Sequence, residues 1–170
     1  MSRERVTDRA FADDNRQFAA KMLAHAKRAA AALGTMPEVL VAQAALETGW
    51  GQHVMSGDGG VSSHNLFGIK ADPSWHGETV RRATLEYFDG HPVRVTAAFR
   101  AYEDYGAAFD DYAKFIQSNP RYQRALERAA EPAAYARELQ RAGYATDPDY
   151  ARKILQIHEQ LANQRAVPAG

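Results

Sequence analysis

The stretch Leu40-Val41-Ala42-Gln43-Ala44-Ala45-Leu46-Glu47-Thr48-Gly49-Trp50-Gly51 places one carboxylate at the end of an otherwise apolar run, just before a glycine-aromatic-glycine turn. A helix is predicted to begin shortly upstream, because Thr35 and Glu38 have capping-box spacing and Pro37 suits a first turn. A helix has about 3.6 residues per turn, so Glu47 shares a face with the residues three, four and seven positions before it. Glu47 is therefore predicted to point inward at a helix end.

An inward carboxyl group at a helix end has a chemical use. Burial removes hydration from the charged form and raises the pKa of the group. A pKa near neutrality is what a general acid needs. Glu47 is therefore the candidate acid, and the alternative is that it is one of the many glutamates that end helices in contact with solvent.

Length and composition predict one globular domain and exclude several classes of function. The chain has 170 residues, of which 45% are hydrophobic, and this is enough for a core. The formal net charge is zero and no block of lysine or arginine stands out, which argues against nucleic acid as a partner. Because the chain has no cysteine, disulfides and thiol catalysis are excluded.

The sequence also lacks the patterns of a membrane span, a signal peptide and a metal site. No apolar run reaches the length of about 18 residues that a span needs, and residues 1–30 are charged throughout. The histidines lack His-Glu-x-x-His spacing, and Asp58-Gly59-Gly60 is too short for an EF-hand loop. We therefore expect no metal and no cofactor.

Helical spacing, loop composition and strand alternation follow one another along the first hundred or so residues. Residues 51–73 are rich in glycine, serine, aspartate and histidine and are predicted to be a loop. Residues 79–101 alternate on either side of Asp89-Gly90, which is a strong hairpin signal. A first helix that stops at Gly34 is predicted from apolar residues at helical spacing: Phe18, Met22, Ala26, Ala29 and Leu33.

Helical spacing returns after the hairpin. Helices are predicted around residues 109–116, from Asn119-Pro120, from Pro132 to Gly143, and from Asp147-Pro148 onward. We therefore expect a mainly α (α+β) fold, in which a helical body carries a small β-hairpin lobe beside a groove. The expected organisation is a linker or disordered start at residues 1–12, one domain at residues 13–164 and a tail at residues 165–170.

Further motifs follow the first in order along the chain. They are Asn65-Leu66-Phe67-Gly68-Ile69-Lys70, Trp75-His76-Gly77, Thr84-Leu85-Glu86-Tyr87, Phe99-Arg100-Ala101-Tyr102, Asn119-Pro120-Arg121-Tyr122 and Gly143-Tyr144-Ala145-Thr146-Asp147-Pro148-Asp149-Tyr150. In this order and spacing, over residues 15–162, the chain resembles the peptidoglycan hydrolases of glycoside hydrolase family 73. The resemblance implies a lysozyme-like fold and is strongest to the members that act in flagellar rod assembly.

The resemblance implies an endo-β-N-acetylglucosaminidase that cleaves the glycan strands of peptidoglycan. Cleavage of a β-1,4 bond needs a proton for the leaving oxygen and stabilisation of an oxocarbenium-like centre. Glu47 matches the catalytic glutamate of the family, Glu86 matches a second carboxylate on the hairpin, and Tyr144 matches a tyrosine that lines the site. The alternative for Glu86 is a solvated strand glutamate, which the residues alone favour, and the alternative for Tyr144 is a packed loop tyrosine.

Aromatic and amide side chains are the candidates for sugar binding, because amphipathic rings suit the faces of sugars. The candidates are Trp50, Asn65, Phe67, Trp75, Tyr87 and Tyr150. Each has a structural alternative. Asn65 and Phe67 can instead brace the catalytic helix, and Tyr150 lies in the apolar stripe of the last helix.

The resemblance implies peptidoglycan strands and flagellar rod proteins as partners of a periplasmic monomer, exported by a flagellar route or as part of a longer protein. Two rival functions stay open. The first is a muramidase or a lytic transglycosylase on the same fold, and the latter needs only one carboxylic acid. The second is a non-catalytic peptidoglycan-binding module, which is disfavoured because burying an unused carboxyl group costs stability.

Overall fold

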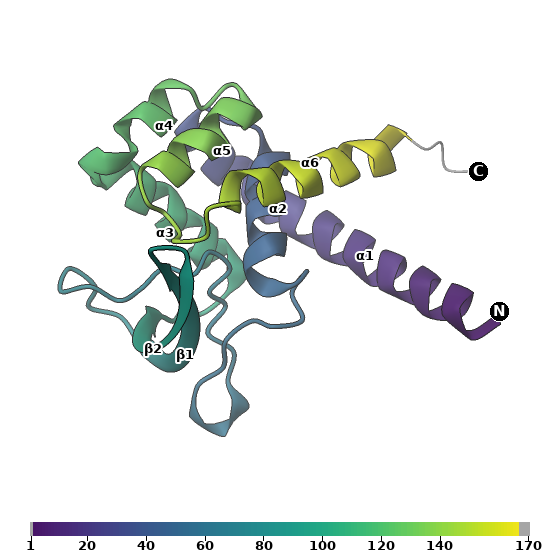
Figure 1. Cartoon of the computed structure of the whole chain (residues 1–170), viewed down its shortest axis with the longest axis horizontal. Helices are drawn as coiled ribbons and strands as arrows, with labels where there is room; N and C mark the ends of the chain where they lie inside the picture. Colours follow the sequence, from purple (N-terminus) through teal and green to yellow (C-terminus); the bar gives the residue numbers. More distant parts are fainter. Residues whose placement is uncertain (1, 167–170) are drawn as a thin grey trace.

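The computed structural model describes the chain from residue 2 to residue 166, with side chains from residue 12 to residue 164. Its strands β1 (Thr79–Phe88) and β2 (His91–Arg100) form an antiparallel hairpin. The helices and 3-10 turns are α1 (Ser2–Leu33), α2 (Pro37–Thr48), η1 (Asp58–Gly60), α3 (Tyr105–Ser118), η2 (Pro120–Tyr122), α4 (Gln123–Glu127), α5 (Pro132–Arg141) and α6 (Tyr150–Ala166). Figure 1 shows the helices gathered in one body, with the hairpin and the loop that precedes it below.

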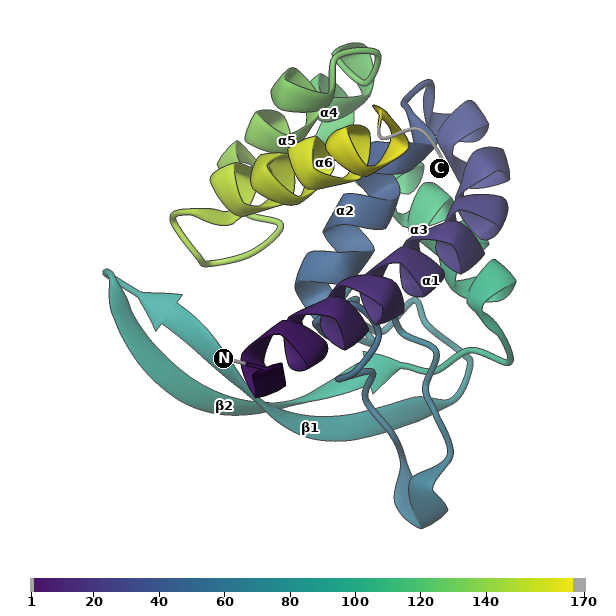
Figure 2. The ribbon, with the colours of Figure 1, turned by 90° about the vertical axis from the view of Figure 1, so that its right-hand side faces the viewer.

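Helix α2 forms the centre of the body, between α1 and α6 (Figure 2). Residues 39–45 are all buried, which suits a helix that is apolar all round. The helix ends at Gly49, whose φ of 55° is left-handed. Two more left-handed residues follow, Trp50 and Gly51. A Cβ on Gly51 would lie 2.6 Å from the ring of Phe18, so this turn requires a glycine there.

The start of α2 differs from the predicted capping box. Met36 occupies the N-cap position and no side chain caps the helix, while Pro37 lies in the first turn as predicted. The reason is that Thr35 belongs to the end of α1, where its backbone N–H donates to Ala30 O at 3.0 Å beyond the left-handed Gly34. The capping-box prediction for Thr35 is therefore wrong.

The hairpin has the predicted turn. Phe88 pairs with His91 across Asp89 and Gly90, whose φ values of 50° and 78° are both left-handed, as a tight two-residue turn requires. At its other end β2 also pairs with the preceding loop, since Arg100 N donates to Ile69 O at 3.0 Å. The loop and the base of the hairpin therefore form one unit.

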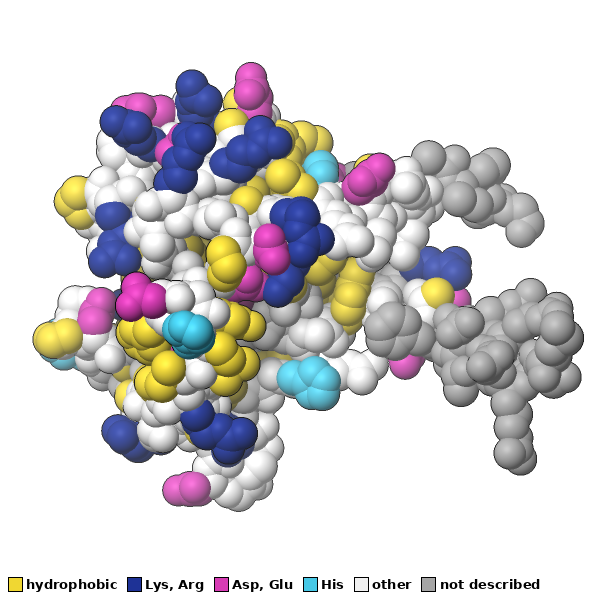
Figure 3. Space-filling model, viewed as in Figure 1, with side chains coloured by type: hydrophobic (Ala, Val, Ile, Leu, Met, Phe, Trp, Pro, Cys, Tyr) yellow, Lys and Arg dark blue, Asp and Glu magenta, His cyan; other side chains and the backbone are white. Residues whose placement is uncertain are grey.

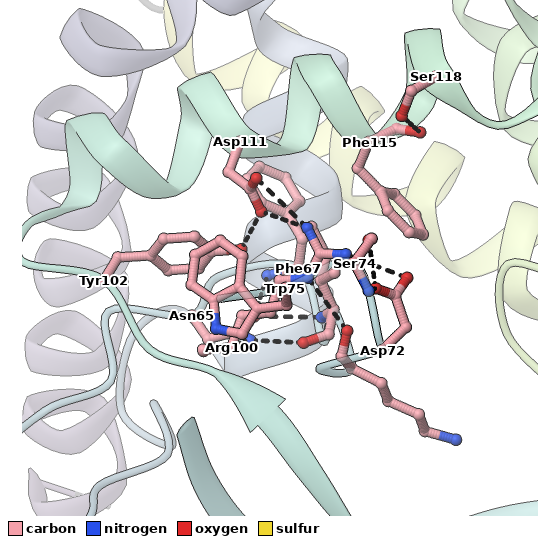
Figure 4. A network of polar contacts seen from close by, with 12 residues as sticks. Asn65, Phe67, Asp72, Ser74, Trp75, Arg100, Tyr102, Asp111, Phe115 and Ser118 are labelled. Atoms are coloured by element: carbon pink, nitrogen blue, oxygen red, sulfur yellow. Dashed lines mark hydrogen bonds and ion pairs between the residues drawn. The ribbon is translucent and has the colours of Figure 1, made fainter. Parts of the chain in front are cut away.

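Arg100 fixes the base of the hairpin to the helical body (Figure 4). The residue is only 6% exposed, and its guanidinium donates to Asp111 of α3 at 3.0 Å and to Asp72 of the loop at 3.3 Å. The guanidinium also lies 5.0 Å from the centre of the Trp75 ring. Because these bonds join α3, the loop and β2, the end of the lobe nearest the body is held on several sides.

The prediction of a mainly α fold with one hairpin lobe is confirmed. The last helix begins at Tyr150, slightly later than the predicted Asp147-Pro148. The backbone of residues 2–12, expected as a linker, belongs to α1, and the boundary at residue 12 stays a prediction. Of the expected tail, residues 167–170 lie outside the described residues. Within residues 2–166, no single helix is long and apolar enough to cross a membrane, and only the pair Ala12–Leu33 and Pro37–Thr48, bent by 118°, passes that test together.

Candidate active site

Glu47 lies in the last turn of α2, half-buried, where the helix meets the loop. Its Oε1 accepts a hydrogen bond of 2.8 Å from the hydroxyl of Tyr150 on α6. Burial raises the pKa of Glu47 from its ordinary value of 4.5 to about 7, and the hydrogen bond from Tyr150 opposes part of that rise. The inward position predicted for Glu47 is confirmed, and its pKa suits a general acid.

The loop passes directly over the carboxyl group of Glu47 at Gly68. A Cβ on Gly68 would lie 2.8 Å from Glu47 Oε2, and the φ of this residue is 63°. Glycine is therefore needed here both for the backbone conformation and for the close approach to the carboxyl group.

Two adjoining hollows meet at Glu47, with volumes of about 490 and 280 Å³. The larger one is in the range of sites that hold small ligands. The residues that line both are Glu47, Gly68, Thr84 and Phe99. The larger hollow continues past Gln52, His53 and Arg82, and the smaller one continues past Glu86 and Tyr144. The two hollows form a groove with Glu47 near its middle, between the helical body and the hairpin.

Glu86 lies on β1 and lines the smaller hollow, so it faces the groove and not open solvent. Its side chain is 18% exposed and forms an ion pair with Lys70 of the loop. Lys70 is a neighbour that sequence reasoning did not single out, although it ends the Asn65–Lys70 motif. The three candidate catalytic residues Glu47, Glu86 and Tyr144 thus line one hollow.

Tyr144 has its ring in a cluster of aromatic side chains and its hydroxyl in a backbone contact. The hydroxyl donates to Phe67 O at 2.6 Å, and the ring stacks on that of Tyr150 with centroids 5.7 Å apart. Tyr144 therefore lines the groove, as expected, and also holds the loop that covers Glu47.

The tip of the hairpin reaches the loop after α5. The backbone N–H of Tyr87 donates to the Thr146 hydroxyl at 2.8 Å. Hydrophobic side chains gather over the hairpin in Figure 3. Two hydrophobic residues of β1 have large exposed fractions, Leu85 at 58% and Phe88 at 53%. Tyr87 thus contributes a backbone contact at the edge of the groove, and its ring is not part of the lining of the two hollows.

Asn65 and Phe67 have contacts that favour the structural alternative, in which they brace the catalytic helix. Asn65 Nδ2 donates to Ile69 O and Arg100 O, and its Oδ1 accepts from the backbone N–H groups of Phe67 and Ile69. These bonds use the donors and lone pairs of the amide. The ring of Phe67 is 1% exposed and stacks on Tyr112 in the core. Asn65 also lines the larger hollow and Phe67 the smaller one, so their binding of sugar stays a prediction.

Trp50, Trp75 and Tyr150 also have structural contacts, and their direct binding of sugar stays a prediction. Trp50 packs edge-on against Phe18 of α1 at 6.4 Å. Trp75 covers Arg100 and donates from its indole N–H to Glu78 O at 2.9 Å. Tyr150 is 3% exposed and donates to Glu47, so it orients the acid from the core side.

The described residues contain no group of three or more histidine, aspartate or glutamate side chains that could hold a metal ion. The site is built from carboxyl groups, hydroxyls and one ion pair. Such a set can donate a proton and stabilise a positive centre, which are the two requirements of glycoside cleavage.

The sequence of the chain is similar to one family of known proteins. Residues 23–163 match the model of the glucosaminidase family, described as mannosyl-glycoprotein endo-beta-N-acetylglucosaminidase. The chain is 51% identical over 153 residues to the peptidoglycan hydrolase FlgJ of Pseudomonas aeruginosa, covering 90% of this chain and 38% of that protein. It is 48% identical over 161 residues to FlgJ of Vibrio parahaemolyticus, covering 95% of this chain and 52% of that protein. The chain thus spans about half the length, or less, of these relatives.

Solved structures show the same architecture. A peptidoglycan hydrolase mutant from Sphingomonas sp. A1 superposes with a TM-score of 0.82 at 41% identity, covering 88% of this chain and 97% of that one. A C-terminally truncated glycoside hydrolase domain of Salmonella typhimurium FlgJ superposes with a TM-score of 0.71 at 40% identity, covering 91% of this chain and 99% of that one. The expected lysozyme-like fold is confirmed by these likenesses.

Proposed function

We propose a function from the premise that this chain belongs to the glucosaminidase family, glycoside hydrolase family 73. The chain is a peptidoglycan hydrolase that cuts glycan strands as an endo-β-N-acetylglucosaminidase. The observation that carries the proposal is Glu47, a half-buried carboxyl group with a pKa of about 7 in the middle of a groove.

Glu47 is proposed to protonate the departing glycosidic oxygen. Near neutral pH much of its population carries a proton, because burial raises its pKa to about 7. The proton transfer is of the kind that positioned side chains accelerate about a hundredfold or more.

Glu86 is proposed to act from the opposite wall, as a base for the attacking water or as an electrostatic stabiliser of the oxocarbenium-like centre. Its ion pair with Lys70 keeps a cation next to the carboxylate in the absence of sugar. When a sugar enters the groove, the positive charge that develops on the reacting ring is a second partner for Glu86.

The groove favours cleavage within a strand. Hollows continue on both sides of Glu47, past His53 in one direction and past Tyr144 in the other. A polymer therefore has room on either side of the reacting bond, which fits an endo-acting enzyme. The neutral net charge of the chain fits a substrate composed mostly of neutral sugar.

A digest of purified peptidoglycan tests the proposal. Borohydride reduction of the products, followed by sugar analysis, identifies the sugar at each new reducing end. We expect reduced N-acetylglucosamine. Reduced muramic acid would mean a muramidase, and 1,6-anhydromuramic ends would mean a lytic transglycosylase.

A Glu47→Gln protein serves as the control in the same digest. If wild-type protein and the variant both bind peptidoglycan and release nothing, the chain is a binding module and the proposed activity is wrong.

The biological setting is also a proposal, supported by the similarity to the hydrolases named FlgJ. The chain would open the wall locally in the periplasm during flagellar rod assembly, as a monomer that contacts rod proteins. Co-purification with cross-linked rod proteins and light scattering of the isolated chain test this setting. A dimer in solution, or a complete absence of rod proteins from the cross-linked sample, would contradict it.

A further inference from the structure

A chain of buried polar groups runs from Glu47 into the core of the helical body. Tyr150 OH donates to Glu47 Oε1 at 2.8 Å, and Gln43 Nε2 donates to Tyr150 OH at 3.0 Å. On the other side of the amide, Tyr112 OH donates to Gln43 Oε1 at 2.6 Å, and Tyr112 and Tyr135 share a further hydroxyl contact. The residues come from α2, α3, α5 and α6, so the chain links four helices.

Ionised Glu47 fixes the direction of every bond in this chain. A carboxylate only accepts, so Tyr150 must donate its one hydroxyl proton to it. The oxygen of Tyr150 then accepts from the amide nitrogen of Gln43, which turns Gln43 Oε1 toward Tyr112. Tyr112 therefore donates its hydroxyl proton to Gln43. In the contact between the hydroxyls of Tyr112 and Tyr135, Tyr135 is then the donor.

The same direction decides where a proton on Glu47 can sit. Oε1 already accepts from Tyr150, whereas Oε2 lies on the side of Gly68, which lines both hollows. A proton on Oε2 leaves the chain unchanged. A proton on Oε1 would compete with the Tyr150 hydroxyl for the same contact. If it displaced the Tyr150 proton toward Gln43, the bonds beyond Tyr150 would reverse.

We propose that Gln43 and Tyr112 are positioning residues, which fix the direction of this chain and thereby keep the proton of the acid on Oε2, the oxygen that faces the groove. The proposal rests on the function proposed for Glu47. Tyr135 ends the chain and is not needed for the direction, since Tyr112 still donates to Gln43 without it.

Burial makes reversal costly. Gln43 is 1% exposed and Tyr112 is 0% exposed, so neither can exchange its partner for water. Reversal requires the Gln43 amide to turn over within the packed core. Burial also raises the pKa of Tyr112 and of Tyr150, so both hydroxyls keep their protons over the working pH range.

The test is a pH titration of the Glu47 carboxyl carbon by NMR, which needs no enzymatic activity. Other titratable groups around Glu47 must be followed with it: Tyr144, Tyr150, Glu86, Lys70, His53 and Arg82. Tyr150→Phe removes the donor to Oε1 and should raise the pKa of Glu47 by about one unit, the scale of one hydrogen bond to a charged group.

Tyr112→Phe is the decisive variant, and Tyr135→Phe is its matched control. Both remove one buried hydroxyl from the same contact, but only the first leaves Gln43 Oε1 without a donor and allows the amide to turn over. We expect Tyr112→Phe to raise the pKa of Glu47 and Tyr135→Phe to leave it unchanged. Equal shifts in the two variants, or no shift in either, would overturn the proposal.

The kinetics of peptidoglycan cleavage by the same two variants provide a second test. Tyr112 is in the core and away from the groove, so Tyr112→Phe should lower kcat by between about twofold and tenfold while KM stays constant. Tyr135→Phe should keep both. A change in KM alone, or equal losses in the two variants, would indicate loosened packing and contradict a positioning role.

A measurement on the unmodified protein covers the case in which Tyr112→Phe does not fold. The side-chain amide protons of Gln43 should show stronger nuclear Overhauser contacts to the ring of Tyr150 than to the ring of Tyr112. The reverse pattern would overturn the proposal. The proposed function and this proposal can fail separately. If wild-type protein leaves peptidoglycan intact while the Gln43 contacts and the Glu47 pKa shifts are as expected, only the proposed function is wrong.

Discussion

The two walls of the groove hold their carboxyl groups in different ways. On the helical wall, Glu47 receives one directed hydrogen bond from a buried tyrosine, and burial raises its pKa to about 7. On the hairpin wall, Glu86 is paired with a lysine and is followed by side chains with large exposed fractions, such as Phe88 at 53%. The core therefore prepares one group to carry a proton, and the lobe presents the other as a partner for positive charge.

The walls also differ in how firmly they are held. The base of the hairpin is tied to α3 through Arg100, which is 6% exposed. Its tip is joined to the rest of the chain by the hydrogen bond from Tyr87 N to Thr146. Isolated two-stranded hairpins are marginally stable. We infer that the helical wall sets the chemistry and that the hairpin wall adjusts to the substrate.

Glu47→Gln should have the largest effect, because it removes the carboxyl group that donates the proton from the helical wall of the groove. Turnover of peptidoglycan should fall by at least about a hundredfold, the lower range for one general acid. Release of soluble fragments from labelled peptidoglycan measures the rate, and sedimentation with intact peptidoglycan shows that binding is kept. Near-normal turnover would remove Glu47 from the mechanism.

Glu86→Gln should have a smaller effect, of at most about a hundredfold, because the hairpin wall can adjust around the change. The same fragment-release assay measures it, with Lys70→Met as the matched variant that breaks the same ion pair and keeps the carboxylate. Full activity of Glu86→Gln would mean that Glu47 is the only carboxylic acid that cleavage needs, which would favour a lytic transglycosylase.

Tyr144→Phe keeps the ring and removes the hydroxyl that holds Phe67 O. The free energy of unfolding should fall by about 1 kcal/mol, and turnover should fall by about tenfold at most, because the loop over Glu47 loosens. Chemical denaturation and fragment release measure the two effects. If Tyr144→Phe kept its stability and activity, the ring of Tyr144 would contribute to both and its hydroxyl to neither.

Thr146→Val should have the smallest effect, since it removes only the bond that joins the hairpin tip to the loop after α5. We expect a change in KM of about fivefold or less with kcat unchanged. Thr146→Ser keeps the hydroxyl and should behave as wild type. A large loss of kcat in Thr146→Val alone would mean that the tip takes part in chemistry.

Much of the fold was accessible from the sequence because its signals are local. The hairpin follows from strand alternation around Asp89-Gly90, and the inward face of Glu47 follows from helical spacing within one short segment. The capping-box prediction failed at Thr35 because the closing turn of α1 uses that residue first. Two local patterns, the capping box of α2 and the closing turn of α1, both involve Thr35. Residue spacing alone does not show which of them forms.

The partners of the site were less accessible because they are distant in sequence. Tyr150 reaches Glu47 across 103 residues and Gln43 across 107, so only the packing of α6 on α2 brings them together. Asn65 and Phe67 were recognised as parts of a motif, but a motif does not distinguish a side chain that touches sugar from one that braces a loop. Their hydrogen bonds and burial favour the bracing role.

The pH dependence of kcat/KM on peptidoglycan tests the central claim most directly, because this ratio reports the ionisation of the uncomplexed enzyme. Glu47 must carry its proton to act, and its pKa of about 7 lies above the ordinary value of 4.5. Activity should therefore fall as pH rises, with a midpoint near 7 in wild-type protein and at higher pH in Tyr150→Phe. A fall centred near 4.5, or a midpoint unmoved in Tyr150→Phe, would contradict the assignment of Glu47 as the half-buried general acid.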